Sequence, residues 1–356
     1  MSFASDNWAG ASTSVINAVS AAMQAGPATA YGADEWTRRA EQSISAFFER
    51  DCAVFFMTSG TAANALALAH VTPPWGTIYA HEMAHVVTSE CGAPEFYSSA
   101  KLHGVAGAGA KIAPQALELA ISRARRGDAH STQPATLSLT NLTECGTCYT
   151  PAEITALAGL AHAHHLTVHL DGARFANALV STNASPAAMT WQAGVDVMSL
   201  GATKNGAMAA EAVVFFDPAR AADFLYRRMR GGHLLSKMRF VAAQFDAWLG
   251  AGHWRDLAAH ANAMAKRLAD GLVTSGLMLA WPADGNEVFP IMPVALADRL
   301  RQSGHVFYPW PGASSLAAGA SLKPHEEISR LICSFQTTIK DVDDFLTALA
   351  TARQQA

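Results

Sequence analysis

Short apolar runs recur along the first two thirds of the chain and alternate with stretches of helical periodicity. The runs lie at residues 53–57, 77–80, 136–141, 167–170, 195–200 and 212–216. Apolar runs of this length are typical of strands buried on both faces, and helices between them are typical of a largely parallel sheet. The pattern therefore predicts an α/β fold with ligands at the carboxyl ends of the strands.

The remaining third predicts a smaller unit. Apolar residues recur at spacings of three and four over 254–272, as they do over 153–164 in the larger unit, and the last amphipathic helix is expected over 340–351. Between the last two helices, VFPIMP, VFYPW and ISRLICSF predict short strands. A length of 356 residues is consistent with two domains. We expect an N-terminal segment at 1–25 near the ligand site, a large domain at 26–250 and a small α+β domain at 251–356.

Composition excludes several classes of protein. Half of the residues are apolar and the formal net charge is −4, which indicates neither a disordered tail nor a nucleic-acid footprint. The start, MSFASDNWAG, lacks the basic and apolar regions of a signal peptide, and no apolar stretch approaches the roughly 20 residues that span a bilayer. Five cysteines, an odd number, fit reduced thiols. We therefore expect a cytoplasmic enzyme with no nucleic-acid or membrane partner.

The segment VDVMSLGATKNG places Lys204 a few residues after an apolar run that ends near Leu200. A lysine in a partly desolvated pocket loses its proton more readily and can form a Schiff base with a carbonyl cofactor such as pyridoxal phosphate. The alternative is an ordinary surface lysine, since most lysines are exposed. The choice between the two depends on which partners the rest of the chain supplies.

Two further segments supply such partners at the ends of apolar runs. CAVFFMTSGTAANALALAH passes from a strand through Ser59, Gly60 and Thr61 into a helix, where free N–H groups can bind a phosphate. The alternative for this turn is a plain helix N-cap. TVHLDGARF ends with Asp171 and Arg174, and an aspartate there can keep a pyridinium nitrogen protonated, so that the ring accepts electrons. The alternative for this pair is a surface salt bridge.

The segment TIYAHEMAHVVTSECG contains a formal HExxH motif in His81, Glu82 and His85. A zinc site would need both histidines on one face of a helix and a third ligand downstream. His81 instead closes a predicted strand over Thr77–Ala80, so the two histidines are expected to straddle a strand and a turn. The competing interpretation makes His85 a flat ring that stacks on a cofactor pyridine. CGTC at 145–148 lacks a second CxxC, so we expect a loop beside the site rather than a redox or zinc pair.

The chain resembles the low-specificity L-threonine aldolases over nearly its whole length. The matching stretches are FASDN, AYGADEW, FFMTSGTAAN, HEMAHVVTSECGAPEF, LTNLTECGTCYTPAEI, HLDGARFANA, DVMSLGATKNG, GGHLLSKMRF and SRLICSFQ. The resemblance implies the aspartate aminotransferase fold, called type I, with a largely parallel seven-stranded sheet between helices. It also implies pyridoxal phosphate, and cleavage of threonine, allo-threonine or phenylserine to glycine and an aldehyde. A homo-oligomer, either a dimer or a homotetramer with sites at the subunit interface, is implied as well.

The resemblance assigns cofactor roles to several residues and assigns no metal. Lys204 matches the Schiff-base lysine, His85 the ring-stacking histidine and Asp171 the partner of the pyridine nitrogen. Arg174 matches the arginine after that aspartate and is expected to contact the cofactor as well as the substrate. The phosphate turn matches Ser59, Gly60 and Thr61, and a further phosphate contact stays open between Lys237 and Arg239.

The resemblance assigns substrate roles to another group of residues. Ser5, Arg174 and Arg330 match positions around the substrate carboxylate, a task that suits a planar bidentate arginine. His130 matches a histidine thought to act with the β-hydroxyl group. The catalytic base stays open among His130, His85 and water. Two alternatives to an aldolase also stay open: another pyridoxal phosphate reaction, such as β-elimination or transamination, and a non-catalytic relative.

Overall fold

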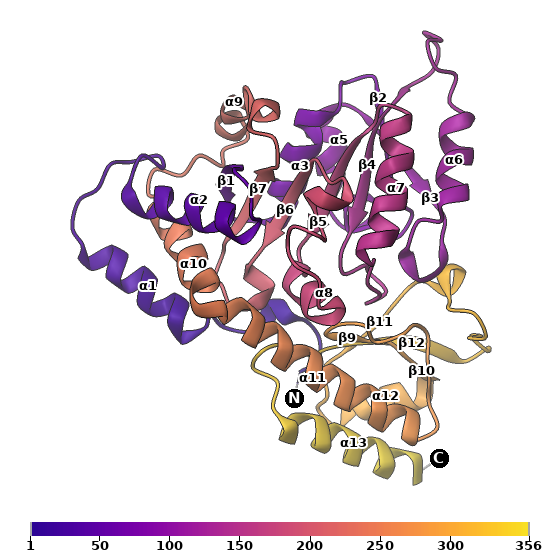
Figure 1. Ribbon diagram of the computed structural model, residues 1–356. Coiled ribbons are helices and arrows are strands. Elements are labelled where there is room, and N and C mark those ends of the chain that lie inside the picture. The colour runs from indigo at the N-terminus through magenta and orange to yellow at the C-terminus, as the bar shows by residue number, and fades with distance from the viewer. Residues whose placement is uncertain (1, 355–356) are drawn as a thin grey trace.

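A seven-stranded sheet organises the first two thirds of the chain (Figure 1). The computed structural model describes residues 2–354. The strands, in spatial order, are β1 (Ala53–Met57), β7 (Glu211–Phe215), β6 (Val197–Gly201), β5 (Thr167–Gly172), β4 (Gln133–Thr140), β2 (Gly76–His81) and β3 (Lys101–Val105). Only β7 runs against its neighbours β1 and β6, and the other pairs in this sheet are parallel. The prediction of a largely parallel seven-stranded sheet is confirmed.

Helices cover both faces of this sheet. One core contains residues of α2 (Glu35–Phe47), α6 (Pro114–Ser122), α7 (Pro151–Ala163), α8 (Phe175–Thr182) and α10 (Arg239–Leu249). The opposite face packs against α3 (Gly60–Val71), α4 (His85–Thr88) and α9 (Phe224–Arg230), with α5 (Ala93–Ser98) beside α3. Because both faces are covered, central strands such as β6 are buried along their whole length. The apolar runs in the sequence reflect this double coverage.

A second, antiparallel sheet follows in the last third of the chain. Its strands are β8 (Met278–Leu279), β9 (Glu287–Val288), β10 (Pro290–Pro293), β11 (Tyr308–Pro309) and β12 (Glu326–Ile332). They share a core with α11 (His253–Thr274), α12 (Val294–Gln302) and α13 (Ile339–Gln354). The expected strands and helices of the smaller unit are thus present. The exact division at residues 25 and 250 stays a prediction, because α11 contributes side chains to both cores.

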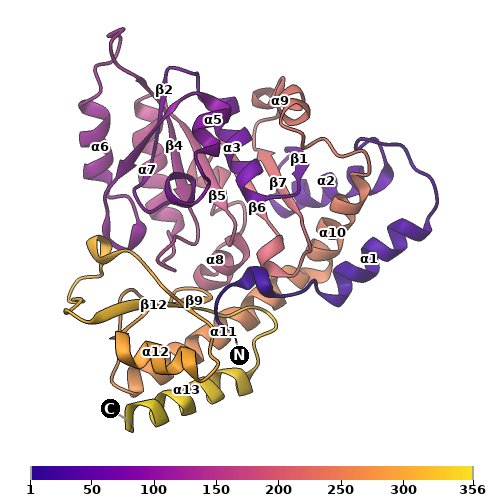
Figure 2. The ribbon, with the colours of Figure 1, turned by 180° about the vertical axis from the view of Figure 1, so that it is seen from behind.

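The N-terminal segment joins the two units. Phe3 lies in the core of the second sheet and exchanges backbone hydrogen bonds with Val306 and Ile332. The chain then passes through η1 (Asp6–Trp8) to α1 (Thr13–Gln24), which packs on α10. Figure 2 shows this indigo segment running between the two sheets. Residues 2–8 are therefore held where the units meet.

Local sequence explains most element boundaries. Thr150 and Glu153 form a reciprocal capping box that starts α7, and Pro151 occupies its first turn. The edge strand β3 was not among the predicted apolar runs, because its sequence KLHGV is mostly polar or partly exposed. Among residues 2–354, the structure contains no helix with the length and apolarity needed to cross a membrane.

Candidate active site

A cavity lies where the carboxyl ends of the central strands face the second sheet and the N-terminal segment. Its lining residues come from all three parts of the chain: Ser5, Asn7, Gly60, Thr61, Asn64, His85, Glu90, Thr140, Leu142, Glu144, Asp171, Ala173, Arg174, Lys204, Glu287, Trp310 and Arg330. This is the edge at which open α/β sheets bind ligands.

Lys204 lies in η4 (Thr203–Asn205), one short turn after β6. Asn205, the next residue, donates a side-chain hydrogen bond of 2.9 Å to the carbonyl of Trp254 in α11. Gly206 then reverses the chain at φ 94°, a left-handed conformation that favours glycine. These contacts fix the backbone of the turn. The half-buried Lys204 therefore lines the cavity from a fixed position.

Asp171 lies near the end of β5 and is almost fully buried. Its Oδ2 accepts a hydrogen bond of 2.8 Å from Nδ2 of Asn64 in α3, and its Oδ1 accepts one of 3.0 Å from the backbone N–H of Ala173. Two donors hold the carboxylate in a single orientation at the cavity wall. This arrangement suits an aspartate that keeps a ring nitrogen protonated.

His85 begins α4 and is held from two sides. Its backbone N–H donates to Glu144 Oε1 at 2.9 Å, and its Nδ1 lies 2.8 Å from Glu90 Oε1. The hydrogen bond to Glu90 is the main reason that the pKa of His85 is raised, although burial acts in the opposite direction. Burial, reinforced by the charge of Asp171, raises the pKa of Glu144 to about 7. The cavity wall therefore carries a carboxyl group, Glu144, that can gain or lose a proton near neutral pH.

Two arginines lie on the side of the cavity next to the second sheet. Arg174 makes a bidentate ion pair with Asp6, through Nε at 2.8 Å and Nη2 at 3.0 Å, and its Nη2 lies 3.4 Å from Glu287. Arg330 in β12 stacks over the ring of Trp310 at 4.3 Å and donates to the carbonyl of Ala4 at 3.1 Å. Its Nε is buried and has no hydrogen-bond partner among residues 2–354. Arg330 thus carries a buried donor that no residue among 2–354 satisfies, as expected for a guanidinium that binds a further acceptor.

The turn before α3 is the predicted phosphate turn. Ser59 is the N-cap, and its side chain accepts a hydrogen bond from the backbone N–H of Ala62. Gly60 and Thr61 form the first turn of this 12-residue helix and line the cavity. The free N–H groups and the positive end of the helix dipole favour an anion here.

Comparison with known proteins identifies the family. Residues 2–295 match the family described as beta-eliminating lyase. The chain belongs to this family. It is 39% identical to low-specificity L-threonine aldolases from Pseudomonas sp. (strain NCIMB 10558), over 94% of this chain and 93% of the relative, and from Pseudomonas aeruginosa, over 96% and 94%. A solved structure of Leishmania major threonine aldolase superimposes with a TM-score of 0.90 at 28% identity, covering 100% of this chain and 99% of the other.

The predicted type I fold is confirmed by this match, and most of the predicted site residues of this beta-eliminating lyase converge on one cavity. The lining includes Ser5, Gly60, Thr61, His85, Asp171, Arg174, Lys204 and Arg330. These residues come from segments up to about 330 positions apart in the chain. Their convergence is an arrangement that no single motif implied.

Three predicted site residues lie outside the cavity lining. His130 lies before β4, at the opposite edge of the sheet, with a side chain 87% exposed and hydrogen-bonded to Asp128. Lys237 is exposed in the loop before α10, and Ser59 is exposed at the N-cap of α3. Within one subunit, His130 therefore does not reach the cavity, and a role for His130 or Lys237 would need a neighbouring copy of the chain.

The HExxH motif of this lyase does not form a helical zinc signature. His81 ends β2 and His85 begins α4, so the two rings do not share a helix face. His81 is buried, with Nε2 at 2.9 Å from the carbonyl oxygen of Gly107 and Nδ1 accepting from the backbone N–H of Met83. Among residues 2–354, no group of three or more metal-ligating side chains is arranged to hold a metal ion.

Four lining residues, together with Asp6 behind the lining, received no role from sequence alone. Asn64, Glu90 and Glu144 contact His85 or Asp171, whereas Asp6 and Glu287 contact Arg174. Asp6, Asn64, Glu90 and Glu144 lie inside the stretches that carry the family resemblance. Their position within those stretches was the available signal, but their partners could be identified only from the fold.

Proposed function

We propose that this beta-eliminating lyase is a pyridoxal phosphate-dependent aldolase that cleaves a β-hydroxy-α-amino acid such as threonine to glycine and an aldehyde. The observation that carries the proposal is the convergence of Lys204, Asp171, the Gly60–Thr61 turn and Arg330 on one cavity. Lys204, Asp171 and the turn suit the aldehyde, the ring nitrogen and the phosphate of the cofactor. Arg330 suits the carboxylate of an amino acid. The 39% identity to two low-specificity L-threonine aldolases over nearly the whole chain supports the same conclusion.

The residues present fit the cofactor. The cavity offers a lysine amine for its aldehyde, a buried carboxylate for its ring nitrogen and a helix N-terminus for its phosphate. Asn64 Oδ1 and Glu90 Oε2 are buried without hydrogen-bond partners among the described residues, which indicates a site adapted to a further polar group. When bound, the cofactor supplies a ring that accepts the electron pair released as a bond to the substrate α-carbon breaks.

We propose that Arg330 binds the substrate carboxylate, with Ser5 and Arg174 beside it. Stacking on Trp310 fixes the plane of the Arg330 guanidinium, and its free Nε can complete a bidentate contact. Arg174 is already engaged by Asp6 on two nitrogens and lies 3.4 Å from Glu287, so its charge is largely offset and its contribution is mainly to the shape of this wall. A fixed carboxylate determines which bond at the α-carbon is aligned for cleavage.

The proton of the β-hydroxyl group needs an acceptor on the side of the cavity that holds His85. We propose that His85 accepts it, directly or through one water molecule, because His85 is the predicted base that lines the cavity within this chain. The hydroxyl oxygen can then form the aldehyde as the carbon–carbon bond breaks. The remaining carbon is reprotonated to give glycine.

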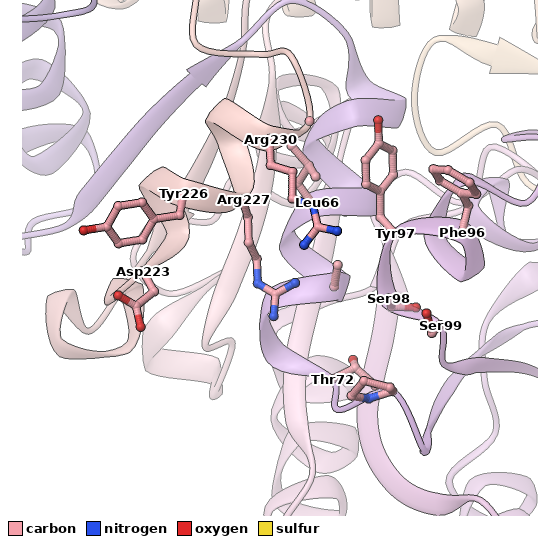
Figure 3. A pocket seen from close by; sticks show the side chains of 13 residues that line it. Leu66, Thr72, Phe96, Tyr97, Ser98, Ser99, Asp223, Tyr226, Arg227 and Arg230 are labelled. Atoms are coloured by element: carbon pink, nitrogen blue, oxygen red, sulfur yellow. The ribbon is translucent and has the colours of Figure 1, made fainter.

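We also propose a homo-oligomer, as a dimer or homotetramer whose sites lie at the subunit interface. Figure 3 shows a groove on the large unit with Phe96 and Tyr97 of α5 on one side and Tyr226 of α9 on the other. Phe96 and Tyr226 are 79% and 71% exposed. Aromatic side chains that are this exposed are typical of protein interfaces, and a neighbouring copy could also bring His130 or Lys237 to a site.

The substrate range and location are further parts of the proposal. We propose that allo-threonine and phenylserine are cleaved as well as threonine, in keeping with the low specificity in the names of the relatives. We propose a cytoplasmic location, supported by five cysteines that are all free thiols.

The test is an absorption spectrum of the purified protein with pyridoxal phosphate, followed by addition of L-threonine with detection of acetaldehyde and glycine. A visible band of the lysine-bound cofactor, together with release of both products, is expected. Formation of a keto acid would indicate transamination or β-elimination instead. Cofactor binding without any turnover would indicate a non-catalytic relative.

A further inference from the structure

Glu90 is a buried carboxylate that the reaction described above does not use. It lies just after α4, five residues beyond His85, and its side chain is fully buried. Its Oε1 lies 2.8 Å from Nδ1 of His85 and accepts a hydrogen bond of 2.9 Å from Nδ2 of Asn64. A buried carboxylate with two such neighbours in an active site needs an explanation, since burying a charge is costly unless it is paired.

Asn64 extends these contacts to the aspartate on the cavity wall. The same Nδ2 that donates to Glu90 also donates to Asp171 Oδ2 at 2.8 Å. His85, Glu90, Asn64 and Asp171 therefore form one continuous row of hydrogen bonds, and all four residues line the cavity. The row joins α4, α3 and β5, which are separate in sequence and adjacent at the site.

The location of the proton in the His85–Glu90 contact follows from relative basicity. A free imidazole has a pKa of about 6.5 and a free glutamate carboxyl about 4.3. Burial raises the pKa of Glu90, but its hydrogen bond with His85 acts in the opposite direction and raises the pKa of His85. The imidazole therefore stays the more basic group, and the shared proton rests on the ring nitrogen. An ionised carboxylate only accepts hydrogen bonds, which places N–H on Nδ1 of the neutral ring. Nε2 then carries the lone pair.

We propose that Glu90 is a positioning residue, which holds His85 in the tautomer with a free Nε2 and, through Asn64, ties its ring to Asp171. The inference rests on the proposed function, in which Nε2 accepts the β-hydroxyl proton. Glu90 itself does not touch the substrate. Its role is to keep one ring nitrogen protonated so that the other stays available as a base.

The charges around His85 determine how its basicity responds to a change at Glu90. Glu90 and Asp171 are negative and favour the protonated ring, whereas Lys204 is positive and opposes it. Glu144 approaches from the loop after β4 and accepts from the backbone N–H of His85. The direct hydrogen bond to Glu90 is the largest of these influences, so its loss should lower the pKa of His85.

The test measures the reactivity of His85 directly. Diethyl pyrocarbonate modifies the unprotonated ring nitrogen of histidine, and peptide mass spectrometry identifies which histidine was modified. The side chain of His85 is 39% exposed, so the reagent can reach it. The rate of His85 modification is followed from pH 5 to pH 8 in the full-length protein, before and after addition of pyridoxal phosphate. The midpoint is the pH at which His85 is modified at half of its maximal rate. In Glu90→Gln, which keeps the shape of the side chain and removes its charge, we expect this midpoint about one pH unit below that of the wild type.

Two controls accompany this variant. Glu82→Gln removes an exposed carboxylate three residues before His85 and should leave the midpoint unchanged. His162, paired with Asp196 and 43% exposed, serves within the same peptide map as a histidine that Glu90→Gln should not alter. The acidic limb of the pH profile of kcat/KM should move together with the His85 midpoint, which a purely structural role of Glu90 would not produce.

The outcomes separate the inference from the proposed function. An unchanged His85 midpoint in Glu90→Gln overturns the role of Glu90, even if threonine is cleaved. If Glu90→Gln does not fold, Glu90→Asp shortens the side chain by one methylene and withdraws the carboxylate from Nδ1 of His85. A His85 midpoint below that of the wild type then supports the role, and an unchanged midpoint overturns it. A wild-type His85 that resists modification at pH 8 without cofactor overturns the inference without any variant. Failure of the proposed function would appear separately, as absence of aldehyde release.

Discussion

The ion pair between Asp6 and Arg174 should be one of the strongest single contributions to stability in this lyase. Asp6 is 1% exposed and accepts from both Nε and Nη2 of Arg174. It also accepts a hydrogen bond of 3.0 Å from Asn286 in the second unit. One carboxylate therefore joins the N-terminal segment, the large sheet and the smaller sheet. Asp6→Ala removes all of these contacts at once.

The loss of unfolding free energy in Asp6→Ala depends on the charge of Arg174, which is left without its partner. Removing one partner of a buried ion pair typically costs about 3–5 kcal/mol, because the remaining charge is uncompensated. Here Glu287 lies 3.4 Å from Nη2 of Arg174 and compensates part of that charge. We therefore expect Asp6→Ala to lose about 3 kcal/mol, the lower end of this range.

The pH dependence of this loss is set by the pKa of Asp6. Burial alone would raise that pKa, but the charges of Arg174 and Lys204 outweigh burial and hold it below 3.8. A carboxylate with a lowered native pKa stabilises the fold above its unfolded pKa, and this contribution is lost as pH falls through the native pKa. The difference between wild type and Asp6→Ala should thus stay constant from about pH 5 to pH 8 and shrink in stronger acid.

Urea unfolding followed by circular dichroism measures the difference, with a matched control in the same chain. Asp343 makes an equally bidentate pair with Arg267, but both side chains are about half exposed. Asp343→Ala should therefore lose no more than about 1 kcal/mol. If the two variants lose the same free energy of unfolding within about 0.5 kcal/mol, the assigned value of the buried pair is wrong.

Four further outcomes are expected. Lys204→Ala should lose both the visible band of the bound cofactor and all turnover, and undiminished turnover would contradict the assignment of this lysine. Arg330→Ala should keep cofactor affinity while affinity for glycine falls, as measured by spectral titration. Burial raises the pKa of Glu211 from 4.5 to about 7, so the native protein loses stability as pH rises through this interval. Glu211→Gln should therefore raise the Tm relative to wild type more at pH 8 than at pH 5. His130→Ala should leave cofactor affinity unchanged, since this exposed side chain lies at the far edge of the sheet from the cavity; weaker cofactor binding in a titration would count against that placement.

The sequence predicted the strands that are buried on both faces and missed one that is not. Six apolar runs correspond to β1, β2, β4, β5, β6 and β7, with ends shifted by up to three residues. The exception, β3, pairs on one side only, with β2. β1 lies at the other edge of the sheet, but α2, α3 and α10 contact it and its sequence AVFFM is apolar, whereas four of the five residues of β3 are exposed or half-buried. Solvent exposure, rather than edge position, therefore removes the apolar signal of β3. Backbone pairing, which depends on the neighbouring strand, decides such a case.

The residues of the site also divide into some that sequence patterns could predict and some that they could not. Lys204 and Asp171 were predictable because Lys204 follows a buried strand and Asp171 lies near the end of one, and the carboxyl ends of parallel strands meet at one edge. Glu90 and Asn64 were not, because their hydrogen bonds join residues 26 and 107 positions apart. Contacts at such separations depend on how α3 and α4 pack on the sheet. Sequence patterns identify which groups are present, and packing decides which of them touch.

Arg174 illustrates this limit most clearly. Its spacing of three residues from Asp171 allowed a local salt bridge between the two, and the resemblance suggested a contact with substrate. In the structure Asp171 is held by Asn64 and the backbone, whereas Arg174 turns to Asp6, 168 positions away. Because Arg174 is bound to Asp6, no guanidinium neutralises the Asp171 carboxylate in this arrangement. An aspartate that keeps a ring nitrogen protonated needs this free negative charge. The N-terminal segment therefore contributes to this wall of the cavity through Asp6, which holds the Arg174 guanidinium by two hydrogen bonds.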